Sequence, residues 1–214
     1  GAVSVWIALA TAYSNYNSPV IPFYVFYSMF GFQRIGDLCW AAGDMQARGF
    51  LVGATSGRTT LNGEGLQHQD GHSHILANTV PNCISYDATF SYEVAVIIQD
   101  GMRRMYQEKE AVYYYLTLLN ENYTHPAMPD GVEQGIIKGM YQFSKASGNH
   151  EHSVRLIGSG SVLRDVIAAA EILDEEFQVD CAIWPATSFK ELAREGQGME
   201  CGTMRTTDKP QSEM

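Results

Sequence analysis

The chain begins with an almost unbroken run of apolar residues, and its first charged residue is Arg34. Residues 1–14 space their apolar side chains at helical intervals, which predicts a buried helix. The polar stretch 14–19 then indicates a turn. Residues 20–30 are rich in aromatic, Val and Ile side chains, which predicts a strand buried on both faces.

The same alternation of element types continues through the next hundred residues. A helix is expected over 32–49, closed by Gly49 and with Arg48 favourably placed at its C-terminal end. Short apolar runs then predict strands, and a long amphipathic run predicts a helix; the strands are 50–56, 82–87 and 111–119, and the helix is 90–110. Apolar strands that alternate with helices indicate an α/β fold, with a parallel sheet covered on both faces.

The composition changes at residues 120–131, where two prolines and a glycine lie among polar residues. This composition is typical of a linker. A second α/β unit is expected after it, with a strand, a Gly-Ser turn and a helix over 154–177. A strand leading into a helix is expected over 181–195, where Ser188 is a plausible N-cap and Glu191 its capping-box partner. The polar residues from 196 onward lack a hydrophobic period and are expected to be disordered.

The amino-acid composition argues against several classes of protein. The formal net charge of −10 argues against a nucleic-acid surface, which needs clustered Lys and Arg. The apolar start is broken by SNYNSP into pieces too short to span a bilayer, so no membrane segment is expected. Four cysteines without CxxC spacing fit a reduced intracellular protein better than a disulfide scaffold.

Groups capable of chemistry are densest in GRTTLNGEGLQHQDGHSHI, residues 57–75. His68, His72 and His74 could bind zinc with a nearby carboxylate, but the intervening glycines argue against one helix presenting them together. A histidine for proton transfer or carboxylate recognition is the stronger functional alternative, and an ordinary surface loop remains open. The GSGS stretch at 158–161 is interpreted as a tight strand-to-helix turn rather than a phosphate loop, because it lacks a third glycine and a GK[ST].

Longer stretches carry a family resemblance. The sequence from Phe23 to Ile75 closely resembles the homodimeric-type pyruvate dehydrogenases, the first and thiamine-diphosphate-dependent component of the bacterial pyruvate dehydrogenase complex. The match continues through PNCISYD, YEVAVIIQDG, YYYLTLLNENY, PAMPDGVEQGI, LIGSGSVLRDVIAAAEIL and TSFKELAREGQ. The resemblance implies an internal fragment of a transketolase-like protein. Its expected parts are a partial pyrimidine-binding domain (1–123), a linker (124–135), a partial C-terminal α/β domain (136–197) and a divergent, disordered tail (198–214).

The resemblance also implies a site. Tyr27, Phe30 and Arg34 match positions around the cofactor's aminopyrimidine ring and the bound intermediate. His68 matches an active-site histidine that contacts the substrate-derived intermediate, and Glu64 lies in the same catalytic loop. An aromatic wall suits a heteroaromatic ring, and Arg34 can hold an anionic group.

The implied cofactors are thiamine diphosphate and Mg²⁺, but no magnesium ligand is expected in this chain. The family's cofactor-activating glutamate falls upstream of Gly1, and no GDG motif occurs in the sequence. The isolated chain is therefore expected to be inactive on pyruvate. The implied partners are a second copy or a complementary subunit and the lipoyl acetyltransferase of the complex, in the cytoplasm. Two alternatives remain: a non-catalytic remnant or separately encoded subunit, and a transketolase-type enzyme acting on another 2-oxo acid.

Overall fold

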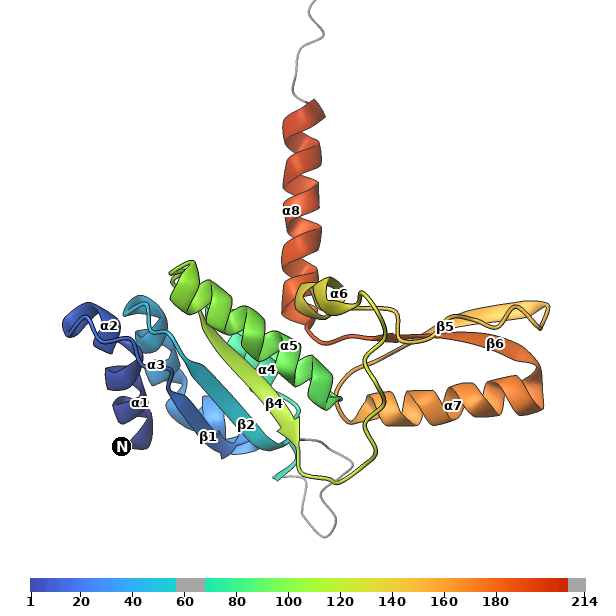
Figure 1. Cartoon of the computed structure of the whole chain (residues 1–214), viewed down its shortest axis with the longest axis horizontal. Helices are drawn as coiled ribbons and strands as arrows, with labels where there is room; N and C mark the ends of the chain where they lie inside the picture. The colour runs from blue at the N-terminus through green and yellow to red at the C-terminus, as the bar shows by residue number, and fades with distance from the viewer. Residues whose placement is uncertain (57–67, 208–214) are drawn as a thin grey trace, which may run out of the picture.

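A computed structural model describes residues 1–56 and 68–207 of the chain (Figure 1). A four-stranded parallel sheet with helices on both faces forms the first domain. A smaller two-stranded parallel sheet packs beside it with helix α7, and helix α8 points away from the body. None of the helices in the described ranges combines the length and apolar character that a bilayer crossing requires.

The first sheet has the strand order β1-β2-β4-β3, and all its pairs are parallel. Its strands are β1 (Phe23–Tyr27), β2 (Phe50–Ser56), β3 (Cys83–Asp87) and β4 (Tyr113–Leu119). Its helices are α1 (Ala2–Ala10), α2 (Ala12–Asn15), α3 (Gly31–Asp44), α4 (Ser73–Thr79) and α5 (Ser91–Met102), with α6 (Glu133–Lys138) after the linker segment. The predicted α/β class with a parallel sheet is confirmed.

Two apolar cores lie on opposite faces of this sheet. Successive side chains of a strand point to opposite faces. Accordingly, Tyr113 and Tyr115 of β4 pack with α1, α3 and α4, whereas Tyr114 and Leu116 pack with α5 and α6. All four side chains are buried. The continuous apolar run in the sequence therefore reflects a strand covered on both faces.

The strand predicted over 20–30 differs from the structure. Strand β1 covers only Phe23–Tyr27, and a 3₁₀ turn, η1, follows at Ser28–Phe30. Because β1 is the edge strand of the described sheet, Phe23 and Val25 are 48% and 60% exposed. The prediction of burial on both faces was wrong for this strand.

The helix predicted over 32–49 also ends earlier than expected. Helix α3 stops at Asp44, and Gln46 takes a left-handed conformation with φ of 56°. The guanidinium of Arg48 lies 3.9 Å from the centroid of the Tyr13 ring and donates to the Lys109 carbonyl. Arg48 therefore ties the helix-to-strand connection to other segments and caps no helix end. The helix predicted over 90–110 is α5 followed by a π-helical turn, η3 (Arg103–Gln107).

The second unit contains β5 (His152–Gly158), α7 (Val162–Phe177), β6 (Val179–Pro185) and α8 (Phe189–Thr207), with β5 and β6 parallel. Ser188 caps α8 as predicted, because its Oγ accepts the Glu191 N–H at 3.1 Å. The Ser188 N–H donates to the Gly139 carbonyl, so the predicted capping-box role of Glu191 is not observed. The helix continues to Thr207, so the expectation of a disordered tail is wrong for the backbone of residues 198–207. Once nucleated, a helix propagates at low cost, and no proline follows before Pro210. Residues 208–214 lie outside the described part of the chain.

Buried polar contacts join the two units along the edge strand β3. The Thr187 carbonyl accepts the Asp87 N–H at 2.8 Å, and the Ser188 hydroxyl donates to the Ser85 carbonyl at 2.6 Å. The ammonium group of Lys190 donates to two carbonyls at the end of α4, those of Ala77 and Val80, at 3.0 and 2.6 Å. These contacts reach from the carboxyl end of β3 to the turn before its first residue, and they fix the second unit beside this edge strand.

Candidate functional site

An aromatic cluster lies where β1 ends. The rings of Tyr27 and Phe30 are 5.4 Å apart between centroids, and the His68 ring meets both edge-on, at 6.2 and 5.6 Å. Tyr27 ends the strand, η1 turns the chain so that Phe30 faces back, and His68 enters from the loop after β2. The ring arrangement makes one face of a site at the carboxyl end of a parallel sheet, where α/β folds place ligands.

Arg34 completes this cluster from the first turn of α3. Its guanidinium carbon lies 4.1 Å from the centroid of the Phe30 ring. The tight path from β1 into α3 requires glycine at position 31, because a Cβ there would lie 1.9 Å from the Phe26 ring. The structure thus brings together Tyr27, Phe30, Arg34 and His68, the four predicted site residues that it describes. Glu64 lies outside the described residues.

Next to His68 along the chain, Asp70 anchors the start of α4. Its carboxylate accepts the Ser73 hydroxyl at 2.5 Å and the backbone N–H groups of Ser73 and His72 at 3.0 and 3.2 Å. Burial alone would raise the pKa of Asp70, but the hydrogen bonds from Ser73 and His72 outweigh it and hold the pKa below its ordinary value. An ionised Asp70 therefore organises the segment that follows the site loop.

A buried polar chain runs from His74 toward the second unit. The Nε2 of His74 lies 2.7 Å from the Thr117 Oγ1, and that hydroxyl lies 2.6 Å from the Asp87 carboxylate. Because the hydroxyl has one proton and gives it to the carboxylate, His74 donates from Nε2. Burial lowers the pKa of His74, against the opposing effect of Asp87 and Asp70. His74 is thus a neutral member of a hydrogen-bonded network.

The described part of the chain gives no support to a zinc site made by the three loop histidines. Among the described side chains, no convergent group of His, Cys, Asp and Glu ligand atoms includes His68, His72 or His74. His72 precedes α4 as its N-cap residue and lies 4.0 Å from Asp70. The three side chains therefore have separate surroundings.

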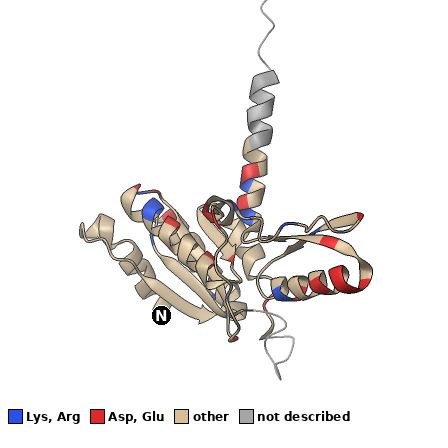
Figure 2. Cartoon of the chain, turned by 45° about the vertical axis from the view of Figure 1, so that its right-hand side comes forward, with Lys and Arg blue, Asp and Glu red and all other residues tan. Residues whose placement is uncertain are grey.

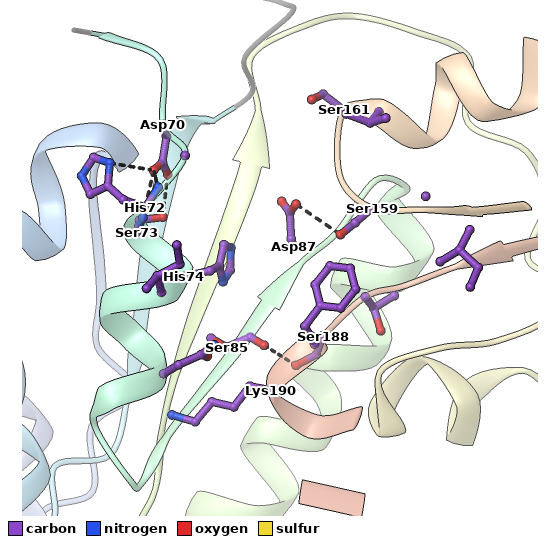
Figure 3. Close-up of a pocket in the computed structure, with 18 residues that line it drawn as sticks. Asp70, His72, Ser73, His74, Ser85, Asp87, Ser159, Ser161, Ser188 and Lys190 are labelled. Carbon is purple, nitrogen blue, oxygen red and sulfur yellow. Dashed lines mark hydrogen bonds and ion pairs between the residues drawn. The ribbon is translucent and has the colours of Figure 1, made fainter. Parts of the chain in front are cut away.

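A cavity of about 460 Å³ opens between α4 and the start of α7 (Figure 3). Figure 3 shows Asp87 pointing across it to Ser159, whose hydroxyl donates to the carboxylate at 3.3 Å. Gly160 has a φ of 51°, and a Cβ there would lie 2.3 Å from an Asp87 oxygen. The carboxylate of Asp87 therefore occupies the position before α7 where a helix N-terminus favours an anion. The GSGS stretch is a strand-to-helix turn, as predicted.

Asp70 and Asp87 were missed as organising residues in the sequence. Asp87 directly follows the apolar residues of a strand, which is a usable signal, because side chains at that place reach the ligand-binding edge of an α/β sheet. For Asp70, the usable sequence signal is its position two residues after His68. The partners of Asp87 cannot be read from the sequence, because Thr117 and Ser159 are distant along the chain. The partners of Asp70 are local, since they lie two and three residues further on.

Comparison with known proteins identifies the family. The profile of the pyruvate dehydrogenase E1 component middle domain matches residues 1–126, and that of the transketolase-like C-terminal domain matches residues 139–211. The chain belongs to the pyruvate dehydrogenase E1 component family. The E1 components of Escherichia coli and Cupriavidus necator are 64% and 62% identical to it over 201 residues. Each match covers 94% of this chain and 22% of the relative, so the chain spans about a fifth of their length.

Solved structures agree on the fold. Transketolase from Campylobacter jejuni superposes with a TM-score of 0.67 at 16% identity, covering 88% of this chain and 27% of that one. A split-gene transketolase described as an inactive beta4 tetramer gives a TM-score of 0.64 at 14% identity, covering 90% of this chain and 55% of that one. At such identity the likeness shows the transketolase-like fold alone.

Proposed function

We propose that this E1-family chain is part of a pyruvate dehydrogenase that decarboxylates pyruvate oxidatively and transfers the acetyl group to a lipoyl group. The observation that carries the proposal is the cluster of Tyr27, Phe30, Arg34 and His68 at the end of β1, in a chain 58–64% identical to curated E1 components over nearly all its length. Aromatic walls with a few charged groups suit a small heteroaromatic cofactor and an anionic substrate.

The residues fit one end of thiamine diphosphate. The tilted rings of Tyr27 and Phe30 can pack against an aminopyrimidine, whereas the chain has no GDG sequence to hold Mg²⁺ and a diphosphate. When bound, the cofactor supplies the electron sink for decarboxylation. The diphosphate and Mg²⁺ are then held by another domain or subunit.

His68 is proposed to act on the substrate, because its ring lies edge-on to the rings of both Tyr27 and Phe30. An imidazole there can donate a hydrogen bond to the pyruvate carboxylate or move a proton during the reaction. Arg34 adds a fixed positive charge that favours an anion. Glu64, four residues before His68, is proposed as its companion in the loop.

The proposed partners follow from the same assignment. The lipoyl acetyltransferase of the complex would receive the acetyl group, and a second copy or a complementary subunit would complete the site. The exposed apolar side chains of the edge strand β1 support such an association. The cytoplasm is the proposed location of this assembly, as the family resemblance implies.

A chimera tests the proposal. The matching 201-residue segment of the Escherichia coli E1 component is replaced by this chain's residues, and pyruvate-dependent reduction of 2,6-dichlorophenolindophenol is measured with thiamine diphosphate and Mg²⁺. The chimera is expected to turn over pyruvate, and the isolated 214-residue chain is expected not to. His68→Ala in the chimera should lower kcat by about 10²-fold or more, because a positioned acid or base contributes that much.

His152→Ala is the matched control, because His152 is exposed at the start of β5. It should leave the rate unchanged. A folded chimera without activity would overturn the proposed function. Full activity of the His68→Ala chimera would remove His68 from the site.

A further inference from the structure

Three potential metal ligands converge in the second unit, away from the aromatic cluster. His150 precedes β5, Asp174 lies in the last turns of α7, and Asp180 lies in β6. One ligand atom from each, an imidazole nitrogen or a carboxylate oxygen, lies within 4.8 Å of the other two. The three segments are consecutive parts of one strand-helix-strand crossover.

Neighbouring groups already orient two of these side chains. The Asp180 carboxylate accepts the Ser147 hydroxyl and, at 3.2 Å, the backbone N–H of His150. The Nε2 of His150 lies 3.1 Å from the Asp174 Oδ1, so the imidazole faces the second carboxylate. Metal ligands are commonly held in this way by hydrogen bonds from outside the coordination sphere, which reduces the ordering that binding requires.

The negative charge around the cluster favours the binding of a cation. The last turn of helix α7 contains Asp174, Glu175 and Glu176 and no basic residue. Figure 2 shows acidic residues along this helix. Carboxylates at a helix C-terminus face the negative end of the helix dipole, which destabilises them. A bound cation would offset both the mutual repulsion and the dipole.

We propose that His150, Asp174 and Asp180 bind a divalent transition-metal ion such as Zn²⁺, which links β5, α7 and β6. One imidazole and two carboxylate oxygens form a ligand set that Zn²⁺ uses, and an imidazole favours transition metals over Mg²⁺ or Ca²⁺. Three protein ligands leave a coordination position for water. The site is independent of the proposed reaction, because it lies in a different unit from the aromatic cluster.

Zinc binding by the 214-residue chain tests the proposal. Competition with a chromophoric chelator, in the presence of a phosphine reductant, gives the affinity and the number of zinc ions bound. The chain should bind one zinc ion that Asp174→Asn removes or weakens by at least about tenfold, a loss typical even of groups that only support metal ligands. Zinc should also raise the melting temperature of the chain and have less effect on the variant.

Glu175→Gln is the matched control, because it removes the same charge from the adjacent residue of α7 without removing a proposed ligand. It should keep the zinc ion. His150→Gln is a second test, and it should lose the ion as Asp174→Asn does. Asp174 is about half exposed, so its substitution leaves the core intact. The proposal is overturned if the chain binds no zinc, or if both ligand variants bind it as the unchanged chain does.

Discussion

The four-stranded sheet and the two-stranded sheet differ in how completely they are covered. Every side chain of Tyr113–Leu116 in β4 is buried, whereas in β5 Val154 and Ile157 are 40% and 56% exposed. The aromatic cluster lies at the end of the covered sheet. Packing against covered strands helps to hold the rotamers of site side chains, and the first sheet offers more of this packing than the second.

The same carboxylate arrangement occurs in both regions. Asp70 and Asp180 each accept hydrogen bonds from a serine hydroxyl and from backbone N–H groups, and these hydrogen bonds lower the pKa of both. Asp70 orders the segment behind an aromatic site, whereas Asp180 lies beside the acidic end of α7. The local hydrogen-bond pattern alone therefore does not define the role of a carboxylate. Its role depends on the charged groups and aromatic rings that lie near it.

Truncation of apolar side chains should give the largest difference in stability between the two sheets. Phe50→Ala removes a fully buried ring from β2 and should lower the free energy of unfolding by about 3–5 kcal/mol. Val154→Ala in β5 removes a side chain that is 40% exposed and should cost less than about 1 kcal/mol. Urea unfolding of the two variants gives both values. Equal losses would mean that the two sheets are equally covered in solution.

A smaller effect is expected where the two regions meet. The Tyr141 hydroxyl donates to the buried carboxylate of Glu93 at 2.7 Å, which joins the segment before β5 to α5. Tyr141→Phe should lower the free energy of unfolding by about 1.5–3 kcal/mol, because a buried acceptor loses a donor. Tyr16→Phe is the control, since Tyr16 is 80% exposed. Parallel fluorescence and circular dichroism curves would show whether the units then unfold separately; an unchanged midpoint would contradict the link.

The smallest effect concerns Asp70 and depends on pH. Its pKa in the folded chain lies below the ordinary value of 3.8, so its stabilisation is present above about pH 4 and is lost as pH falls through the folded pKa. Asp70→Asn should cost about 1 kcal/mol at pH 7, and the difference should shrink toward pH 2. Thermal melts across this range measure it, with exposed Asp130→Asn as control. A difference that grows in acid would refute the assignment.

Strands with continuous apolar character were predictable, because burial on both faces leaves a signal in consecutive residues; the strands β2, β3 and β4 lie where the pattern placed them. The exposure of β1 was not predictable, because an edge position depends on strand order and not on local sequence. The network of His74, Thr117 and Asp87 depends on the register that sets Asp87 opposite Thr117. The proximity of Tyr27, Phe30 and His68 was expected only through the family resemblance, since it spans a loop between strands.

The strand order also has a consequence for folding during synthesis. In the described sheet β3 pairs only with β4, and β2 reaches β3 only through β4. A ribosome therefore releases β3 before its partner exists, and Tyr113 emerges roughly 25 residues after Asp87. At about 5–20 residues per second, the backbone of β3 waits about one to five seconds for its hydrogen bonds. During that interval its apolar side chains are available to chaperones or to neighbouring nascent chains.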